Sequence, residues 1–151
     1  MACWLMKSEP SVYSIEDLER AGTDAWDGVR NYQARNYLRA MRRGDRAFFY
    51  HSNCPEPAVM GVMEIVREAY PDPTALDPAS PYHDPKSTAD RPRWSAVDVR
   101  FVERLPHPVP LAAIKADPAL AELPLVRRGN RLSVMPVTVA QWRRILELAG
   151  A

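Results

Sequence analysis

Residues 46–66 have the sequence RAFFYHSNCPEPAVMGVMEIV, and two apolar runs inside this stretch decide the fold class. The run 47–50 is rich in aromatic residues and favours a β-strand, and Gly44-Asp45 before it is typical of a turn. In the run 59–66 both alternating sets of positions are apolar except at Gly61 and Glu64, as in a strand that is covered on both faces. We therefore predict a sheet in which residues 59–66 form a central strand.

The segments before this stretch predict one further strand and two helices. Residues 3–7 are expected to open the sheet, and Ser14 is the expected N-cap of a short helix that has acidic residues in its first turn. Residues 31–43 carry apolar side chains at helical spacing before Gly44, which predicts a second helix. This helix and its exit turn would carry most of a basic cluster, a pattern that by itself usually marks a solvated face. The cluster consists of Arg30, Arg35, Arg39, Arg42, Arg43 and Arg46.

The segments after it predict a mixed chain. Residues 97–101 alternate apolar and polar side chains, as a half-buried strand does, and residues 110–116 suit a short helix with proline in its first turn. Residues 131–135 are predicted to form another strand, and Thr138 to cap a final amphipathic helix. The uneven spacing indicates an α/β (α+β) fold, a small bent sheet or barrel with peripheral helices. We expect one shared core that contains Trp4, Phe49, Val62, Ile65, Val97, Val99, Phe101 and Val134.

The segment from Tyr70 to Arg93 has a different character. It contains six prolines and few aliphatic residues, so we predict a long loop in place of regular structure. Loops of this length are usually functional or disordered.

Composition limits the class of protein. A chain of 151 residues with a net charge of +1 fits one compact domain and gives no overall attraction to nucleic acid. The chain has no apolar run of the roughly 20 residues that a membrane span needs, and it begins without the pattern of a secretory signal, so we expect a cytoplasmic protein. Two cysteines, Cys3 and Cys54, and three scattered histidines predict reduced thiols and no metal site.

Polar and aromatic residues gather in four segments that do not have the pattern of regular core structure. These are residues 7–10 (KSEP), 26–32 (WDGVRNY), 50–53 (YHSN) and 127–133 (RRGNRLS). A pocket for a flat heterocycle needs an aromatic face for stacking and a few fixed donors and acceptors for the ring edge. The alternative is that Trp26 and Tyr32 belong to the core and that the polar residues are helix caps.

Catalytic signatures are absent from the sequence. It contains no glycine-rich phosphate loop, dinucleotide fingerprint, nucleophile elbow or paired-histidine metal motif. Glu9 and His51 could form an acid/base pair if the fold brought them together, which would favour an enzyme that acts on a nucleotide or small molecule. A module that binds a peptide or metabolite is a further alternative.

Several stretches together resemble the EVE domain family. They include WLMKSEP, WDGVRNYQARN, FYHSN, REAYPDPT, DPKS, PRW, VDVRFVE and LPLVRRGNRLSVMPV, which occur in the family's order and cover almost the whole chain. The resemblance implies one EVE domain over residues 1–151, with a PUA-like fold related to the YTH and ASCH domains. It also implies binding of a flipped or single-stranded modified base, with modified cytosine in DNA as the leading ligand.

We therefore expect a non-enzymatic, cofactor-free module that recognises a base in nucleic acid, with modified DNA favoured and RNA as the alternative polymer. Trp26 and Tyr32 are predicted to stack on the base, because aromatic side chains stabilise an extrahelical base. The predicted base-binding residues are Ser8, Trp26, Val29, Asn31, Tyr32, Ser52, Asn53, Leu132 and Ser133, and the predicted phosphate-binding residues are Lys7, Arg30, Arg35 and Arg131.

Overall fold

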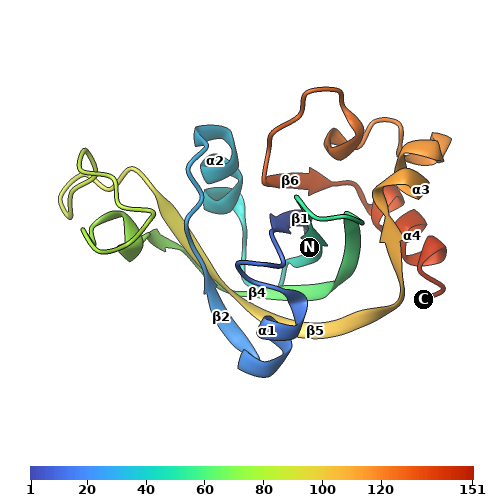
Figure 1. Ribbon diagram of the computed structural model, residues 1–151, viewed down its shortest axis with the longest axis horizontal. Coiled ribbons are helices and arrows are strands. Elements are labelled where there is room, and N and C mark those ends of the chain that lie inside the picture. Colours follow the sequence, from blue (N-terminus) through green and yellow to red (C-terminus); the bar gives the residue numbers. More distant parts are fainter.

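The computed structural model describes residues 1–151 and contains one strongly bent, six-stranded sheet (Figure 1). The strands follow one another in space in the order β2-β5-β4-β3-β1-β6, and only the pair β1–β3 is parallel. Their bounds are Cys3–Ser8 (β1), Thr23–Trp26 (β2), Arg46–His51 (β3), Ala58–Pro71 (β4), Ser95–Pro110 (β5) and Val134–Val137 (β6). The mixed sheet agrees with the predicted fold class.

Four α-helices surround the sheet: α1 (Ile15–Ala21), α2 (Tyr32–Ala40), α3 (Leu111–Ala116) and α4 (Val139–Leu148). Three of them start at side-chain caps, because the side chains of Ser14, Asn31 and Thr138 accept hydrogen bonds from backbone N–H groups in the first turn. Ser14 and Thr138 are the predicted caps, whereas Asn31 was predicted to bind a base. Short 3₁₀ turns lie at Pro73–Ala75, Pro118–Leu120 and Pro124–Val126. None of the helices has the length and apolar character that crossing a membrane would require.

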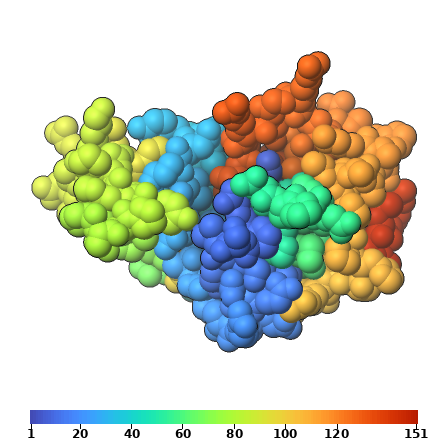
Figure 2. Space-filling model, viewed as in Figure 1, coloured from blue at the N-terminus to red at the C-terminus, as the bar shows by residue number.

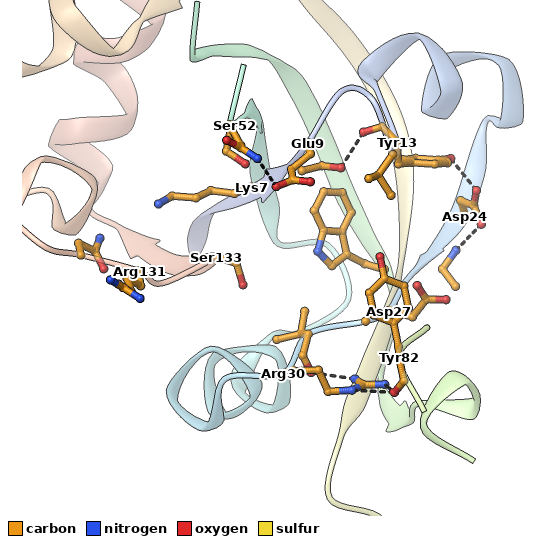
Figure 3. A pocket seen from close by; sticks show the side chains of 18 residues that line it. Lys7, Glu9, Tyr13, Asp24, Asp27, Arg30, Ser52, Tyr82, Arg131 and Ser133 are labelled. Atoms are coloured by element: carbon orange, nitrogen blue, oxygen red, sulfur yellow. Dashed lines mark hydrogen bonds between the residues drawn. The ribbon is translucent and has the colours of Figure 1, made fainter. Parts of the chain in front are cut away.

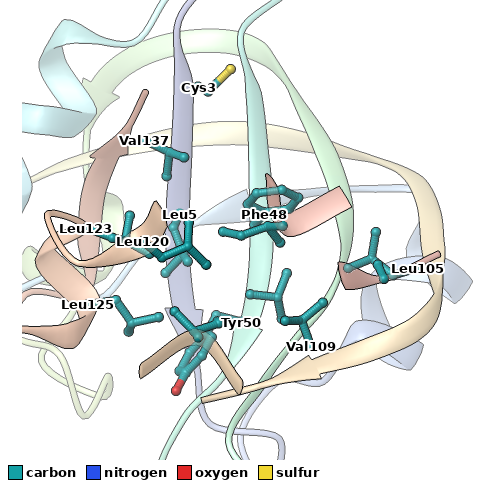
Figure 4. Packing of buried hydrophobic residues seen from close by; sticks show 14 of the residues in the cluster. Cys3, Leu5, Phe48, Tyr50, Leu105, Val109, Leu120, Leu123, Leu125 and Val137 are labelled. Carbon is teal, nitrogen blue, oxygen red and sulfur yellow. The ribbon is translucent and has the colours of Figure 1, made fainter. Parts of the chain in front are cut away.

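The sheet has a separate apolar cluster on each face, and this corrects the expectation of one shared core. One cluster lies beneath α1 and α2 and holds Trp4, Phe49, Ile65, Val97, Val99 and Val134, with Phe101 packed at its edge. Val62 belongs to the other cluster, beneath α3 and α4, where Leu5 and Phe48 are fully buried (Figure 4). Successive residues of a strand point to opposite faces, so a strand that is covered twice supplies both clusters.

Several predicted boundaries were wrong. β2 was not predicted, and β4 and β5 are much longer than the runs that indicated them. The second helix ends at Ala40, so Arg42 and Arg43 lie beyond it, and β6 begins at Val134 instead of at Arg131. Residues 127–133 are therefore an irregular segment in front of a short strand.

Gly61 explains how α1 can approach the sheet. A Cβ atom at this position would lie 2.6 Å from the carbonyl oxygen of Glu103, and even closer to the side chain of Ile15. The register of β4 against β5 shifts on both sides of this point. The missing side chain therefore lets the buried Ile15 of α1 rest directly on a bend of the sheet.

The proline-rich loop is tied to its surroundings by hydrogen bonds. The indole N–H of Trp94 donates to the carboxylate of Asp84 (2.7 Å), and the backbone N–H of Asp84 donates to the carbonyl of Ala75 (3.0 Å). At its base Asp72 is buried. This loop projects from one end of the molecule (yellow-green in Figure 2) and brings Tyr82 back towards residues 28–30.

Candidate functional site

The parallel pairing of β1 and β3 brings their carboxyl ends to the same edge of the sheet. Lys7 is aligned with Tyr50 and Ser8 with His51, and the chain continues with a hydrogen bond from the N–H of Ser52 to the carbonyl of Ser8 (3.0 Å). On the other side of β1, the N–H of Lys7 donates to the carbonyl of Ser133 (2.8 Å). Three of the four polar segments found in the sequence therefore meet at one place.

A cavity of about 1210 Å³ opens between this edge and the end of β2 (Figure 3). All four predicted segments contribute to its wall, together with the turn that precedes α1 and one residue of the proline-rich loop. The lining residues are 7–9, 12–13, 24–30, 52–53, 82, 130–131 and 133.

Trp26 forms an apolar part of this wall and also belongs to the core. Its ring meets Phe49 edge to face, with ring centroids 5.4 Å apart, and only 7% of the residue is exposed. Val29, also buried, lines the cavity beside it. Trp26 therefore belongs both to the core and to the cavity wall, because the indole packs on Phe49 and faces the cavity.

Three carboxylates line the cavity, and two of them are already engaged. Glu9 accepts a hydrogen bond from the side-chain amide of Asn53 (2.8 Å), and Asp24 accepts one from the hydroxyl of Tyr13 (2.5 Å). Asp27 makes no hydrogen bond or ion pair with another residue, although it lies next to Trp26. Desolvation by surrounding protein atoms raises the pKa of Asp27, and the charges of Asp72 and Asp24 raise it further. Asp27 is thus available to accept a hydrogen bond from a ligand.

The cations of the cavity also differ in whether they have hydrogen-bond partners within the protein. Lys7 and Arg131 make no side-chain hydrogen bond or ion pair and can meet an anion. Burial lowers the pKa of Lys7. The five N–H groups of Arg30, in contrast, are all used within the chain, on Tyr82, Val29, Asp72 and Thr74. The prediction that Arg30 binds phosphate was wrong, because it has no donor left.

Arg30 and Asp72 instead hold the cavity wall together. The Asp72 side chain is fully buried and accepts from the N–H of Gly28 (2.9 Å) and from the guanidinium of Arg30 (3.0 Å). Burial by itself raises the pKa of Asp72, but hydrogen bonds from Thr74, Gly28 and Arg30 outweigh it and lower the pKa. Gly28 has a φ of +76°, and a Cβ at this position would lie only 2.9 Å from the ring of Tyr82. Neither Asp72 nor Tyr82 is among the site residues predicted from the sequence.

Nine of the predicted site residues line the cavity and four do not. The nine are Lys7, Ser8, Trp26, Val29, Arg30, Ser52, Asn53, Arg131 and Ser133. Asn31 caps α2, the backbone N–H of Leu132 donates to Asn130, and the ring of Tyr32 stacks on Trp94 with centroids 4.7 Å apart. Arg35 lies over Tyr32 and donates to the carbonyl of Arg93, so this aromatic group forms a separate structural unit outside the cavity.

His51 does not form the acid/base pair that was considered with Glu9. It does not line the cavity, it is only 8% exposed, and its Nε2 accepts a hydrogen bond from the backbone N–H of Ile15 (3.1 Å). Burial lowers the pKa of His51, although Glu16 acts in the opposite direction. His51 is therefore a neutral structural acceptor that anchors the first turn of α1.

This role predicts a pH dependence of stability. The pKa of His51 in the folded state lies below the ordinary value of 6.5. The contribution of His51 to the free energy of unfolding is therefore complete above about pH 6.5 and is lost as the pH falls, because the unfolded chain binds the proton more readily than the folded one. Urea unfolding between about pH 7 and pH 5 should show a loss of at most about 1.4 kcal/mol per pH unit from this residue. His51→Gln, which does not titrate, should flatten the slope. Equal slopes in the two proteins would contradict the assignment.

Comparisons with known proteins identify the family of this chain. The family model of the EVE domain matches residues 2–148. The chain belongs to the EVE domain family. Human thymocyte nuclear protein 1 is 46% identical to this chain over an alignment of 164 positions, which covers 96% of this chain and 72% of the human protein.

Several solved structures are similar to this chain over the whole fold. A protein from Pseudomonas syringae is 57% identical to this chain with a TM-score of 0.96, and the aligned region covers 98% of this chain and 99% of the Pseudomonas syringae chain. Human THYN1, solved in complex with DNA that contains 5-methylcytosine, has 45% identity and a TM-score of 0.94, with 100% and 99% covered. A YTH domain from Zygosaccharomyces rouxii shares the fold at 16% identity and a TM-score of 0.54. The fold is therefore PUA-like, as the resemblance implied.

Proposed function

We propose that this EVE protein is a non-enzymatic reader of a modified base in nucleic acid, with 5-methylcytosine in DNA as the preferred ligand. The observation that carries the proposal is the cavity itself, in which a buried indole lies beside a carboxylate and two cations without partners. The complex of human THYN1 with DNA that contains 5-methylcytosine supports the choice of ligand.

Trp26 would supply the stacking surface. Base–aromatic stacking stabilises a bound base by about 1–3 kcal/mol, and a ring that is already held by the core loses little freedom when the base arrives. Its contact with Phe49 holds it in this way.

Asp27 would recognise the edge of the cytosine ring. The exocyclic amino group at N4 is a hydrogen-bond donor, and aspartate and glutamate are the side chains that accept from it. Of the three carboxylates in the cavity, Asp27 is the one that has no partner in the protein. Ser8, Ser52 and Ser133 offer hydroxyl groups around the same space.

Lys7 and Arg131 would bind the phosphates next to the base, whereas Arg30 shapes the wall. A catalytic role finds no support in the cavity, because His51 is bound to the backbone of Ile15 and Glu9 to Asn53. The cytoplasmic location inferred from the sequence stays a prediction.

The test compares matched single-stranded DNA oligonucleotides that carry 5-methylcytosine, cytosine or thymine at one position, with an RNA strand as a fourth probe. Thymine has the same methyl group as 5-methylcytosine but presents an acceptor in place of the N4 donor. We expect the protein to prefer 5-methylcytosine over both other bases in fluorescence anisotropy titrations. Equal affinity for the three DNA strands would contradict base recognition, and tighter binding of the RNA would identify an RNA reader.

Asp27→Asn should remove the preference for 5-methylcytosine over thymine. The loss should be roughly 5- to 150-fold, because one base-edge contact contributes about 1–3 kcal/mol of discrimination and the new amide can donate to thymine. Asp90→Asn, which removes the same charge from an exposed loop position outside the cavity, is the control. An unchanged preference in a folded Asp27→Asn protein would show that another group recognises the base edge.

A further inference from the structure

A second cavity of about 720 Å³ adjoins the first one. The two share Lys7, Ser52, Asn53 and Asn130, so these residues form a boundary between them. In Figure 2 the segments around residues 53 (green) and 130 (orange) meet on one face of the molecule. A ligand that extends out of the first cavity past Lys7 would enter the second.

The charge of this second cavity is entirely positive. Its lining contains Lys7, Lys115, Arg127 and Arg128 and no acidic residue, whereas the first cavity has three carboxylates. None of these four cations makes a side-chain hydrogen bond or an ion pair with the protein. Some arginines elsewhere are neutralised, for example Arg104 by Glu16 and Glu19, and Arg144 by Asp117 and Glu147. Unpaired cations that lie close together repel one another, so a bound anion would stabilise them.

The floor between these cations is apolar. Leu125 and Tyr50 are buried, and Leu111 and Val126 are partly buried against the same cluster. A free inorganic anion would use only the charged rim. A ligand that has both a charge and a less polar body, such as the phosphate and sugar of a nucleotide, would use the rim and the floor together.

We propose that the second cavity binds the nucleotide adjacent to the recognised base in the same strand, with its phosphate on Lys7, Arg127 and Arg128 and its sugar over Leu125 and Val126. This inference rests on the proposed function of the first cavity. The second cavity binds independently of sequence, because it offers phosphate contacts and an apolar surface. It also assigns a role to the pair Arg127-Arg128, which lies outside the base-binding cavity.

The test uses the double substitution Arg127→Gln/Arg128→Gln in the whole protein. Its matched control is Arg43→Gln/Arg143→Gln, which removes two unpaired cations that line neither cavity. We expect binding of a single-stranded 5-methylcytosine oligonucleotide to weaken by about tenfold at low salt, and the slope of log affinity against log salt to fall by about 0.7, because one phosphate loses its arginine contacts. The preference for 5-methylcytosine over thymine should remain.

A second measurement compares the free nucleoside 5-methyldeoxycytidine, a dinucleotide that contains it, and inorganic phosphate. The dinucleotide should bind more tightly than the nucleoside, and the double substitution should remove most of that gain without changing the affinity for the nucleoside. Salt dependence equal to that of the control protein, or inorganic phosphate binding as tightly as the dinucleotide, would overturn the proposal. If the unmodified protein shows no base preference but the salt slope still falls, the proposed function fails and the second cavity stands.

Discussion

Replacing Trp26 with alanine is expected to cost about 3–5 kcal/mol of folding stability and also to weaken the binding of a modified base. The stability loss follows from removing a large side chain that packs on Phe49 within the core. The binding loss, about 1–3 kcal/mol or roughly 5- to 150-fold, follows from removing the stacking surface. Urea unfolding measures the first effect, and titration with the 5-methylcytosine and thymine strands at low temperature measures the second.

The two effects can be separated because the chain offers a matched tryptophan on the other face of the sheet. Trp142 of α4 stacks on Phe48 with ring centroids 3.8 Å apart and lines neither cavity. Trp142→Ala should therefore lower stability without changing base preference, and Trp26→Phe should retain part of the binding. If folded Trp26→Ala protein keeps the full affinity of the unmodified protein for the 5-methylcytosine strand, the cavity does not bind the base through this ring.

Asp72→Ala should be comparably damaging, although Asp72 touches no predicted ligand. The substitution leaves the guanidinium of Arg30 and the N–H of Gly28 without their buried acceptor. Removing one partner of a buried ion pair costs about 3–5 kcal/mol, because the other charge remains desolvated. The turn at Gly28 and the ring of Tyr82 should loosen with it, so affinity for the 5-methylcytosine strand should also fall in protein that is still folded.

Asp77→Ala is the control for this substitution, because Asp77 lies in the same loop but is exposed and accepts only from the nearby N–H of Ala79. It should change the free energy of unfolding by no more than about 0.5 kcal/mol. A loss below about 1 kcal/mol for Asp72→Ala would mean that water replaces the carboxylate and that the ion pair of Arg30 and Asp72 does not hold the cavity wall together.

The resemblance carried by many separated motifs identified the family, and short-range patterns identified the elements. Ser14 and Thr138 were recognised as helix caps because a cap bonds to a backbone group only two or three residues away. The strand at 46–51 and the doubly covered start of β4 were also found, since alternation along a strand is a local property. The four polar segments were correctly grouped, and the structure brings residues from all of them to one cavity.

Only the tertiary structure decided which side chains of those segments are free to bind. Arg30 and Lys7 are both cations in the polar segments predicted to form the pocket. Arg30 donates its N–H groups to residues that include Asp72 and Tyr82, which are 42 and 52 residues away in the sequence, whereas the side chain of Lys7 makes no hydrogen bond within the protein. Asp27 differs from the other carboxylates of the cavity for the same reason. Glu9 and Asp24 accept hydrogen bonds from side chains of the protein, and Asp27 does not. Hydrogen-bond partners distant in the chain leave no periodic trace in a sequence, since their positions depend on how the sheet bends and where its loops return.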